Sequence, residues 1–377
     1  MNEYFSENGP LSKSIDRYKY RREQVDMSLA VSSALDKESI LVAEAGTGTG
    51  KTFAYLVPAL LKECKTIIST GTKTLQDQLF LKDIPKVKKA LGLNNRISLL
   101  KGRSNYICHH YLHRTKSEGR FRTKVDLQNF IKIEEYARFS NTGDKTLFAD
   151  VSENAEIWNA VVSSRDNCLG TDCEFYDKCF VIKARADAMN SDIVVVNHHL
   201  FFADILLRDV GLSELLPDCQ AVIFDEAHMV ESVASDHLGV GISNTSIERL
   251  LSKLYNERTH RGLLVHYRMS DLEIDVLRTR RAAEDFFSKL KARSEGMGEN
   301  PLRIPYAKII PDSLGEPLLR LARSLKHAGE KITNQAERHD FFSLADRLTL
   351  QAGTIGTWLQ QGVPGSVCCG ARNGALV

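Results

Sequence analysis

Two short strings in the sequence carry residue types that handle phosphate groups. The first is the glycine-rich run 45–52, Ala-Gly-Thr-Gly-Thr-Gly-Lys-Thr, and the second is Asp-Glu-Ala-His at 225–228. The apolar runs 40–43 and 221–224 precede them and are typical of buried strands. A helical pattern from 53 to 61 follows the first string. A strand, a glycine-rich loop and a helix in this order form the setting that a phosphate-binding loop requires.

The chemistry that these strings predict is hydrolysis of a nucleoside triphosphate. Lys51 would reach the β- and γ-phosphates, and the Thr52 hydroxyl group would bind Mg²⁺. We expect Asp225 to hold the metal from the opposite side and Glu226 to polarise the attacking water. Backbone N–H groups of the loop would converge on the phosphate oxygens. The predicted nucleotide-binding loop residues are Ala45, Gly46, Thr47, Gly48, Thr49, Gly50, Lys51 and Thr52.

Strand and helix patterns place both strings in an α/β unit. Helical and strand patterns alternate over residues 25–100, with a strand and turn at 66–72 and a helix at 75–81, and strand signals return at 192–197. From 101 to 170 the strand pattern stops, which indicates an insertion of helices and loops.

After Ser243 the pattern becomes helical. Apolar residues recur at helical spacing at Ile247, Leu250, Leu251 and Leu254, and Thr245 and Glu248 have the spacing of a capping box. We interpret 246–350 as a second, all-helical insertion.

Four cysteines lie in or near the first insertion. Cys168, Cys173 and Cys179 fall within one loop-like stretch, and Cys108 lies upstream. Four thiolates can bind Zn²⁺ or hold an iron–sulfur cluster. The spacing matches neither paired Cys-x-x-Cys knuckles nor the bacterial ferredoxin run, so it leaves the metal open. Packing of the thiols as small apolar groups is the alternative.

The start of this insertion is basic. Residues 101–125 contain seven lysine or arginine residues and one glutamate, with Tyr106, Tyr111 and Phe121 among them. Such a segment could bind a phosphate backbone and stack bases. A solvated helical face explains the pattern equally well.

Bulk properties set the class of protein. The 377 residues carry a formal net charge of +2, with 43% hydrophobic and 26% charged residues. These values are ordinary for a globular protein and leave room for two or three domains. No apolar run approaches the length of a membrane span, and the first residues are polar, so we expect a cytoplasmic protein without disulfides.

The end of the chain reads as a hairpin with its turn at Asn373-Gly374. The sequence stops three residues into the second strand, which predicts a fragment of a longer protein.

Five motifs in fixed order carry a family resemblance over nearly the whole chain. They are the strings 44–52, 69–72, 101–108, 196–201 and 225–228. The chain resembles the N-terminal half of XPD/DinG-like iron–sulfur superfamily 2 DNA helicases, and it is most like their bacterial YoaA branch. The resemblance implies a RecA-like P-loop lobe, a parallel sheet with helices on both faces, interrupted by an iron–sulfur insertion and a helical arch.

The resemblance also implies a domain layout. The expected parts are the first part of motor lobe 1 (1–100), the iron–sulfur insertion (101–190), the second part of lobe 1 with the Asp-Glu-Ala-His box (191–245), the arch (246–350) and a return to lobe 1 that is truncated before lobe 2 (351–377). The second-lobe string Gln-x-x-Gly-Arg-x-x-Arg, which carries an arginine finger, does not occur here. The piece alone is therefore expected to be inactive.

Particular residues take on roles through the resemblance. It implies a [4Fe–4S] cluster on Cys108, Cys168, Cys173 and Cys179. Gln24 would read the adenine of ATP, and His228 would link the nucleotide state to the DNA-binding surface. Glu226, Lys51 and His228 are the implied catalytic residues.

The implied activity is ATP-dependent, 5′-to-3′ unwinding in DNA repair or replication. Single-stranded or forked DNA would be the substrate, replication or repair proteins the partners, and the full-length protein a monomer away from membranes. Two alternatives stay open. One is an ATP-binding module that binds single-stranded DNA or senses redox state without unwinding, and the other is a P-loop ATPase that acts on protein.

Overall fold

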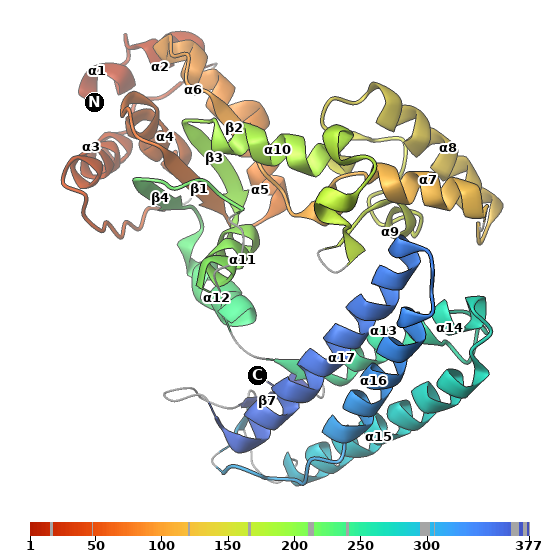
Figure 1. Ribbon diagram of the computed structural model, residues 1–377. Helices are drawn as coiled ribbons and strands as arrows, with labels where there is room; N and C mark the ends of the chain where they lie inside the picture. Colours follow the sequence, from red (N-terminus) through yellow and green to blue (C-terminus); the bar gives the residue numbers. More distant parts are fainter. Residues whose placement is uncertain are drawn as a thin grey trace. The chain divides into compact units, whose positions relative to one another are not determined.

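The chain forms two compact units in the computed structural model (Figure 1). Unit 1 comprises residues 1–164 and 170–238, and unit 2 comprises 165–169 and 239–377. The structure describes residues 1–15, 18–46, 48–119, 121–164, 167–209, 215–238, 241–294, 302–304, 306–362, 369–371 and 375–376.

A four-stranded parallel sheet forms the centre of unit 1. Its strands are β1 (Thr66–Thr70), β2 (Ile97–Leu99), β3 (Ile193–Asn197) and β4 (Ala221–Phe224), in the order β2-β3-β1-β4. Ile68 of β1 is level with Val195 of β3 and Ile223 of β4. The strands predicted at 66–72, 192–197 and 221–224 are confirmed, and so is the α/β class.

Helices cover both faces of this sheet. On one face, α4 (Lys51–Leu61) packs Leu56 and Leu60 against Ile68 and Val195. On the other face, α10 (Phe180–Met189) and α11 (His198–Asp209) pack against the alternate residues of the same strands. Burial of both faces accounts for the unbroken apolar runs of β1 and β3. The other helices around this sheet are α1 (Asn2–Phe5), α2 (Pro10–Ser14), α3 (Arg22–Asp36), α5 (Lys73–Gln78), a π-helical turn (Leu79–Asp83), α6 (Ile84–Leu91) and α12 (Val230–Leu238).

The strand predicted at 40–43 is wrong. The segment is irregular, and Ile40 is 97% exposed and Val42 92% exposed. A strand needs a neighbour for its backbone N–H and C=O groups, and no described strand pairs with this segment. Apolar composition alone therefore does not fold it.

The segment between β2 and α10 has a core of its own. It contains α7 (His109–Glu118), α8 (Lys124–Phe139), α9 (Trp158–Val161) and 3₁₀ turns at Arg103–Asn105, Lys145–Leu147, Gly170–Asp172 and Tyr176–Lys178. Tyr106, Phe130, Ile133 and Trp158 pack together at its centre. Isolated bridges, Tyr106–Asp144 and Ile107–Val162, take the place of strands here.

Unit 2 is a helical bundle with a small antiparallel sheet. Its helices are α13 (Asn244–Leu254), α14 (Leu263–His266), α15 (Ser270–Ser294), α16 (Gly315–Glu330) and α17 (Gln335–Gln360). Its strands β5 (Ile242–Ser243), β6 (Leu302–Arg303), β7 (Cys369–Ala371) and β8 (Ala375–Leu376) run in the order β5-β8-β7-β6. Of these strands, only β6 lies within 246–350, the range for which helices alone were expected.

Two details of unit 2 bear on the sequence predictions. The capping box of α13 joins Ser243 and Ser246, not Thr245 and Glu248, because the helix begins directly after β5. Strands β7 and β8 pair as the predicted hairpin, whose turn lies outside the described residues. Helix α17 runs unbroken through residue 350. The predicted domain boundaries stay predictions.

Hydropathy of the helices gives one further finding. Among the described helices, none combines the length and the apolar character that crossing a bilayer requires.

Candidate functional site

The glycine-rich loop leads directly into helix α4. Gly50 is the N-cap of α4 with φ 82° and ψ 36°, and Gly48 has φ 80°. These left-handed conformations favour glycine, which explains the residue type at both positions. Lys51 and Thr52 follow as the first residues of the helix and are half-buried. Thr47, also predicted to bind nucleotide, lies outside the described residues.

Gln24 of α3 contacts the end of this loop. Its side chain is buried, and Nε2 donates a hydrogen bond to the Gly50 carbonyl oxygen over 2.8 Å. A Cβ atom on Gly50 would lie 2.1 Å from that nitrogen, so a side chain there would push Gln24 away. Gln24 Oε1 has no hydrogen-bond partner among the described residues. The adenine-reading role of Gln24 stays a prediction.

Asp225 lies at the end of β4 and faces α4. Its Oδ2 accepts a hydrogen bond from the Tyr55 hydroxyl group over 3.1 Å, and its backbone N–H donates to the Ser69 carbonyl oxygen over 2.8 Å. Burial raises the pKa of the Asp225 carboxyl group above its usual value, whereas the Tyr55 hydrogen bond and the Lys51 charge lower it. Lys51 thus lies close enough to Asp225 to stabilise its charge.

Tyr55 joins the two predicted metal ligands. Burial raises its pKa well above the usual value, as does the neighbouring Asp225 carboxylate, whereas a hydrogen bond with the Thr52 side chain lowers it. The structure therefore brings Lys51, Thr52 and Asp225 together around one buried hydroxyl group. These are an ammonium group, a hydroxyl oxygen and a carboxylate, a donor set that suits Mg²⁺ bound to phosphate.

Glu226 occupies an unusual backbone conformation. Its φ is 58° and its ψ is 48°, in the left-handed region that is costly for a side chain with a Cβ atom. Its N–H donates to Asp225 Oδ1 over 3.2 Å, and its Oε2 lies 3.4 Å from His228 Nδ1. His228 is exposed. The turn thus presents Glu226 beside Asp225, as a water-polarising role requires.

His198 is a buried polar residue next to this turn that sequence reasoning did not single out. It opens α11 directly after β3, is 0% exposed, and places Nδ1 2.7 Å from Ser69 Oγ. Burial lowers the pKa of His198, while hydrogen bonding with the backbone of Glu226 and Asp225 raises it. A polar residue just after an apolar strand was the signal, but its buried partner lies 129 positions away.

Two of the predicted cluster cysteines lie near a third, Cys108. Burial raises the pKa of the Cys108 thiol most, and nearby Cys179 and Cys173 raise it further. These two are half-buried, as is Cys168. Within the described ranges, no group of three or more histidine, cysteine or carboxylate residues has an arrangement ready to hold a metal ion.

Lys101, from the basic run, is buried in unit 1. Its Nζ lies 2.6 Å from Asp77 Oδ1 on α5 and 2.8 Å from Asp144 Oδ2, and its side chain is 1% exposed. Tyr106 is also buried, and its hydroxyl oxygen accepts a hydrogen bond from the Lys101 backbone. These two residues therefore tie the insertion to the motor sheet, and neither is placed to contact DNA.

Other cations of the basic run are paired with carboxylates. Lys116 lies 2.7 Å from Glu134, and Arg122 lies 2.6 Å from Glu156. The acidic partners come from beyond residue 125, so the charge of the run is partly neutralised in the fold.

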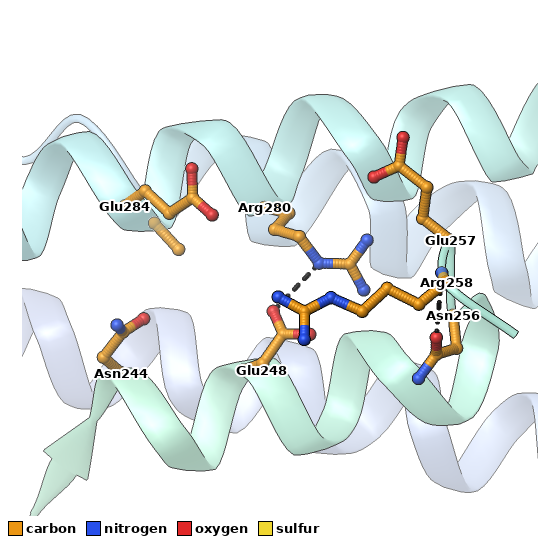
Figure 2. A pocket seen from close by; sticks show the side chains of 8 residues that line it. Asn244, Glu248, Asn256, Glu257, Arg258, Arg280 and Glu284 are labelled. Atoms are coloured by element: carbon orange, nitrogen blue, oxygen red, sulfur yellow. Dashed lines mark hydrogen bonds and ion pairs between the residues drawn. The ribbon is translucent and has the colours of Figure 1, made fainter.

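A concavity of unit 2 lies between α13 and α15 (Figure 2). Arg280 Nε lies 2.9 Å from Glu248 Oε2, and a guanidinium nitrogen also donates to the Tyr255 carbonyl oxygen. The rest of the lining is Asn244, Asn256, Glu257, Arg258, Ala283 and Glu284. Opposite charges neutralise each other here, and the lining contains no nucleophile or metal-ligand set.

Comparison with known proteins finds similar sequences among named helicases. No sequence-family profile matches the chain. It is 46% identical over 243 residues to a protein of Haemophilus influenzae named ATP-dependent DNA helicase YoaA, covering 64% of this chain and 38% of that protein. The Escherichia coli protein of the same name is 44% identical over 247 residues, covering 66% and 39%. These matches assign to the chain a similarity to proteins named as ATP-dependent DNA helicases over about two thirds of its own length.

More distant relatives agree with this assignment. The ATP-dependent helicase DinG of Mycobacterium tuberculosis is 32% identical over 268 residues, covering 63% of this chain and 40% of that protein. The chain spans about two fifths of the length of these relatives. A solved structure named truncated XPD aligns with 93% of the chain and 84% of that structure, at a TM-score of 0.41 and 14% identity. At these values the structural likeness decides nothing about the site.

Proposed function

We propose that the chain is part of an ATP-dependent DNA helicase and supplies the nucleotide-binding half of its motor. The single observation that carries this proposal is the meeting of Tyr55, Thr52 and Asp225, which joins the glycine-rich loop to the Asp-Glu-Ala-His box. The relatives named as ATP-dependent DNA helicases support the same activity.

Each residue of the nucleotide site has a separate role in the proposed ATP hydrolysis. In this proposal Lys51 and the N-terminus of α4 neutralise the phosphates. Thr52 and Asp225 hold Mg²⁺, and Glu226 orients the attacking water beside them. Gln24 contacts the adenine, and His228, exposed next to Glu226, passes the nucleotide state toward DNA.

A [4Fe–4S] cluster is the second cofactor of the proposal. Cys108, Cys168, Cys173 and Cys179 would hold it, and the nearness of Cys173 and Cys179 to Cys108 supports this proposal. Thiolates are the ligands that such clusters use. Bound there, the cluster would supply a rigid cross-link, a redox centre or both.

The remaining parts of the proposal concern the whole protein. We place it in the cytoplasm as a monomer that moves 5′ to 3′ on single-stranded or forked DNA during repair or replication. Replication or repair proteins would be its partners. The longer relatives leave room for a second motor lobe, which would close over the nucleotide.

Nucleotide binding and turnover test the proposal. In the full-length protein, we expect Lys51→Ala to abolish ATP hydrolysis and to weaken binding of a fluorescent ATP analogue. Lys37→Ala, at the exposed end of α3, is the matched control and should leave both unchanged. Unchanged turnover in Lys51→Ala would refute the site.

Stimulation by DNA separates the candidate functions. A helicase should hydrolyse ATP faster with single-stranded DNA and unwind a forked duplex. A binding or redox-sensing module should bind DNA and nucleotide without unwinding. An ATPase that acts on protein should ignore DNA altogether.

A further inference from the structure

We infer that His198 is a positioning residue that holds the Asp225–Glu226 turn against strand β1 and thereby sets the rate of ATP hydrolysis without touching ATP. The inference rests on the proposed function and deepens it. It names an interior support for the turn that carries the metal-binding and water-polarising carboxylates.

Ser69 of β1 contacts both His198 and the Asp225–Glu226 turn. Its carbonyl oxygen accepts a hydrogen bond from the Asp225 N–H over 2.8 Å, and its hydroxyl oxygen lies 2.7 Å from His198 Nδ1. One residue of β1 therefore contacts both the imidazole and the start of the turn. Ser69 itself is fully buried, so solvent does not compete for these contacts.

The second imidazole nitrogen, Nε2, is buried and forms no hydrogen bond with a described residue. A fully buried polar atom without a partner is costly. The backbone of Glu226 and Asp225 raises the pKa of the ring, so the turn lies near the imidazole. We assign to Nε2 the contact with the backbone of this turn.

The turn needs such support. Glu226 holds a left-handed conformation that costs of order 1–3 kcal/mol and persists only where neighbours fix it. Gly71, two residues after Ser69, approaches it from the same strand end, where an added Cβ would lie 3.5 Å from Glu226 Cβ. The Phe224 ring lies 5.8 Å from the His198 ring. His198, β1 and the turn thus form one buried contact.

Two conservative substitutions separate the two nitrogens. His198→Asn would keep a polar atom near the place of Nδ1, and His198→Gln would keep one near the place of Nε2. The matched control is His199→Asn, because the His199 ring lies on the exposed side and contacts His237 over 3.2 Å. Hydrogen exchange of the peptide that covers the turn is measured without nucleotide, and kcat and KM for ATP are measured with DNA, both on the full-length protein.

The expected result is local and asymmetric. In His198→Asn, exchange at the turn should rise about ten-fold and kcat should fall about ten-fold, as loss of a buried hydrogen bond predicts, with KM within about two-fold. His198→Gln should keep most of both properties, and His199→Asn should match the wild type.

Other results would overturn the inference. Unchanged exchange at the turn in His198→Asn would do so, and so would equal losses in the two His198 variants together with faster exchange throughout unit 1, since that marks a purely structural role. If the full-length wild type hydrolyses no ATP while the exchange pattern is as expected, the proposed function fails and the positioning role stands.

Discussion

The Tyr55 hydroxyl group donates a hydrogen bond to Asp225 Oδ2 across 3.1 Å. The two residues lie 170 positions apart in the sequence, and they connect the first turns of α4 with the end of β4. This hydrogen bond holds the helix proposed to bind phosphate and the carboxylate proposed to bind metal at a fixed distance from each other. Preorganisation of this kind lowers the reorganisation that binding would otherwise require.

Replacing Tyr55 with phenylalanine tests this link. Tyr55→Phe leaves the aromatic packing in place but removes the hydrogen bond, so Asp225 should be less well oriented toward Mg²⁺. We expect the Mg²⁺ concentration for half-maximal nucleotide binding to rise several-fold, with a stability loss of about 1 kcal/mol. A Mg²⁺ titration with a fluorescent ATP analogue measures the first effect. An unchanged Mg²⁺ requirement would show that the tyrosine only packs.

The raised pKa of Asp225 predicts a pH dependence of stability. Because its folded pKa lies above its unfolded value, the folded state binds this proton more tightly. The contribution of this group to stability is therefore greatest below the unfolded pKa, falls as the pH rises through the folded pKa, and stays low at neutral pH. Asp225→Asn should raise the melting temperature at pH 7 without Mg²⁺.

The gain from Asp225→Asn should disappear in acid, where the wild-type carboxyl group is also neutral. The melting temperatures of the wild type and of Asp225→Asn, measured from acidic pH up to pH 7, test this prediction. A variant that melts below the wild type at pH 7 would contradict the burial of this charge.

The buried Lys101 network makes a prediction about stability. Lys101→Met leaves Asp77 and Asp144 without their cation, and we expect a loss of about 3–5 kcal/mol. Lys116→Ala, which removes an exposed pair, should cost at most about 1 kcal/mol. Urea unfolding compares the two. Converting both aspartates to asparagine alongside Lys101→Met should recover part of the loss, and failure to recover it would assign the loss to packing.

Metal content tests the cysteine assignment. Protein purified without oxygen should be brown and contain about four irons per chain. Cys173→Ser should bleach it and loosen the segment between β2 and α10, whereas Cys219→Ser, in the core beside β3, should keep the iron. Iron analysis and the visible spectrum measure both. Stoichiometric zinc in place of iron would exclude the cluster.

The sequence predicted best those elements whose structure depends on the residue types within the element itself. The strands β1 and β3 were predictable because burial on both faces requires an unbroken apolar run. The loop before α4 was predictable because Gly48 and Gly50 supply conformations that other residues avoid.

Prediction failed where the outcome depended on a distant partner. The run at 40–43 has strand composition but no neighbouring strand among the described residues, so it stays irregular and exposed. Lys101 looked like a surface cation because its carboxylate partners lie 24 and 43 positions away. His198 and Ser69 lie in two of the strings that carry the family resemblance, but nothing near either residue in sequence shows that their side chains meet.

The strand order of unit 1 also determines when its sheet can form during synthesis of the chain. β1 can pair only with β3 and β4, which begin about 120 and 150 residues after β1 ends. At about 5–20 residues per second, a ribosome needs roughly 8–30 s to pass from the end of β1 to the end of β4. The segment between β2 and α10 has its own core around Phe130 and Trp158 and can fold during that interval. The segment that contains the cysteines would therefore fold before β4 has been synthesised and the sheet of unit 1 can be completed.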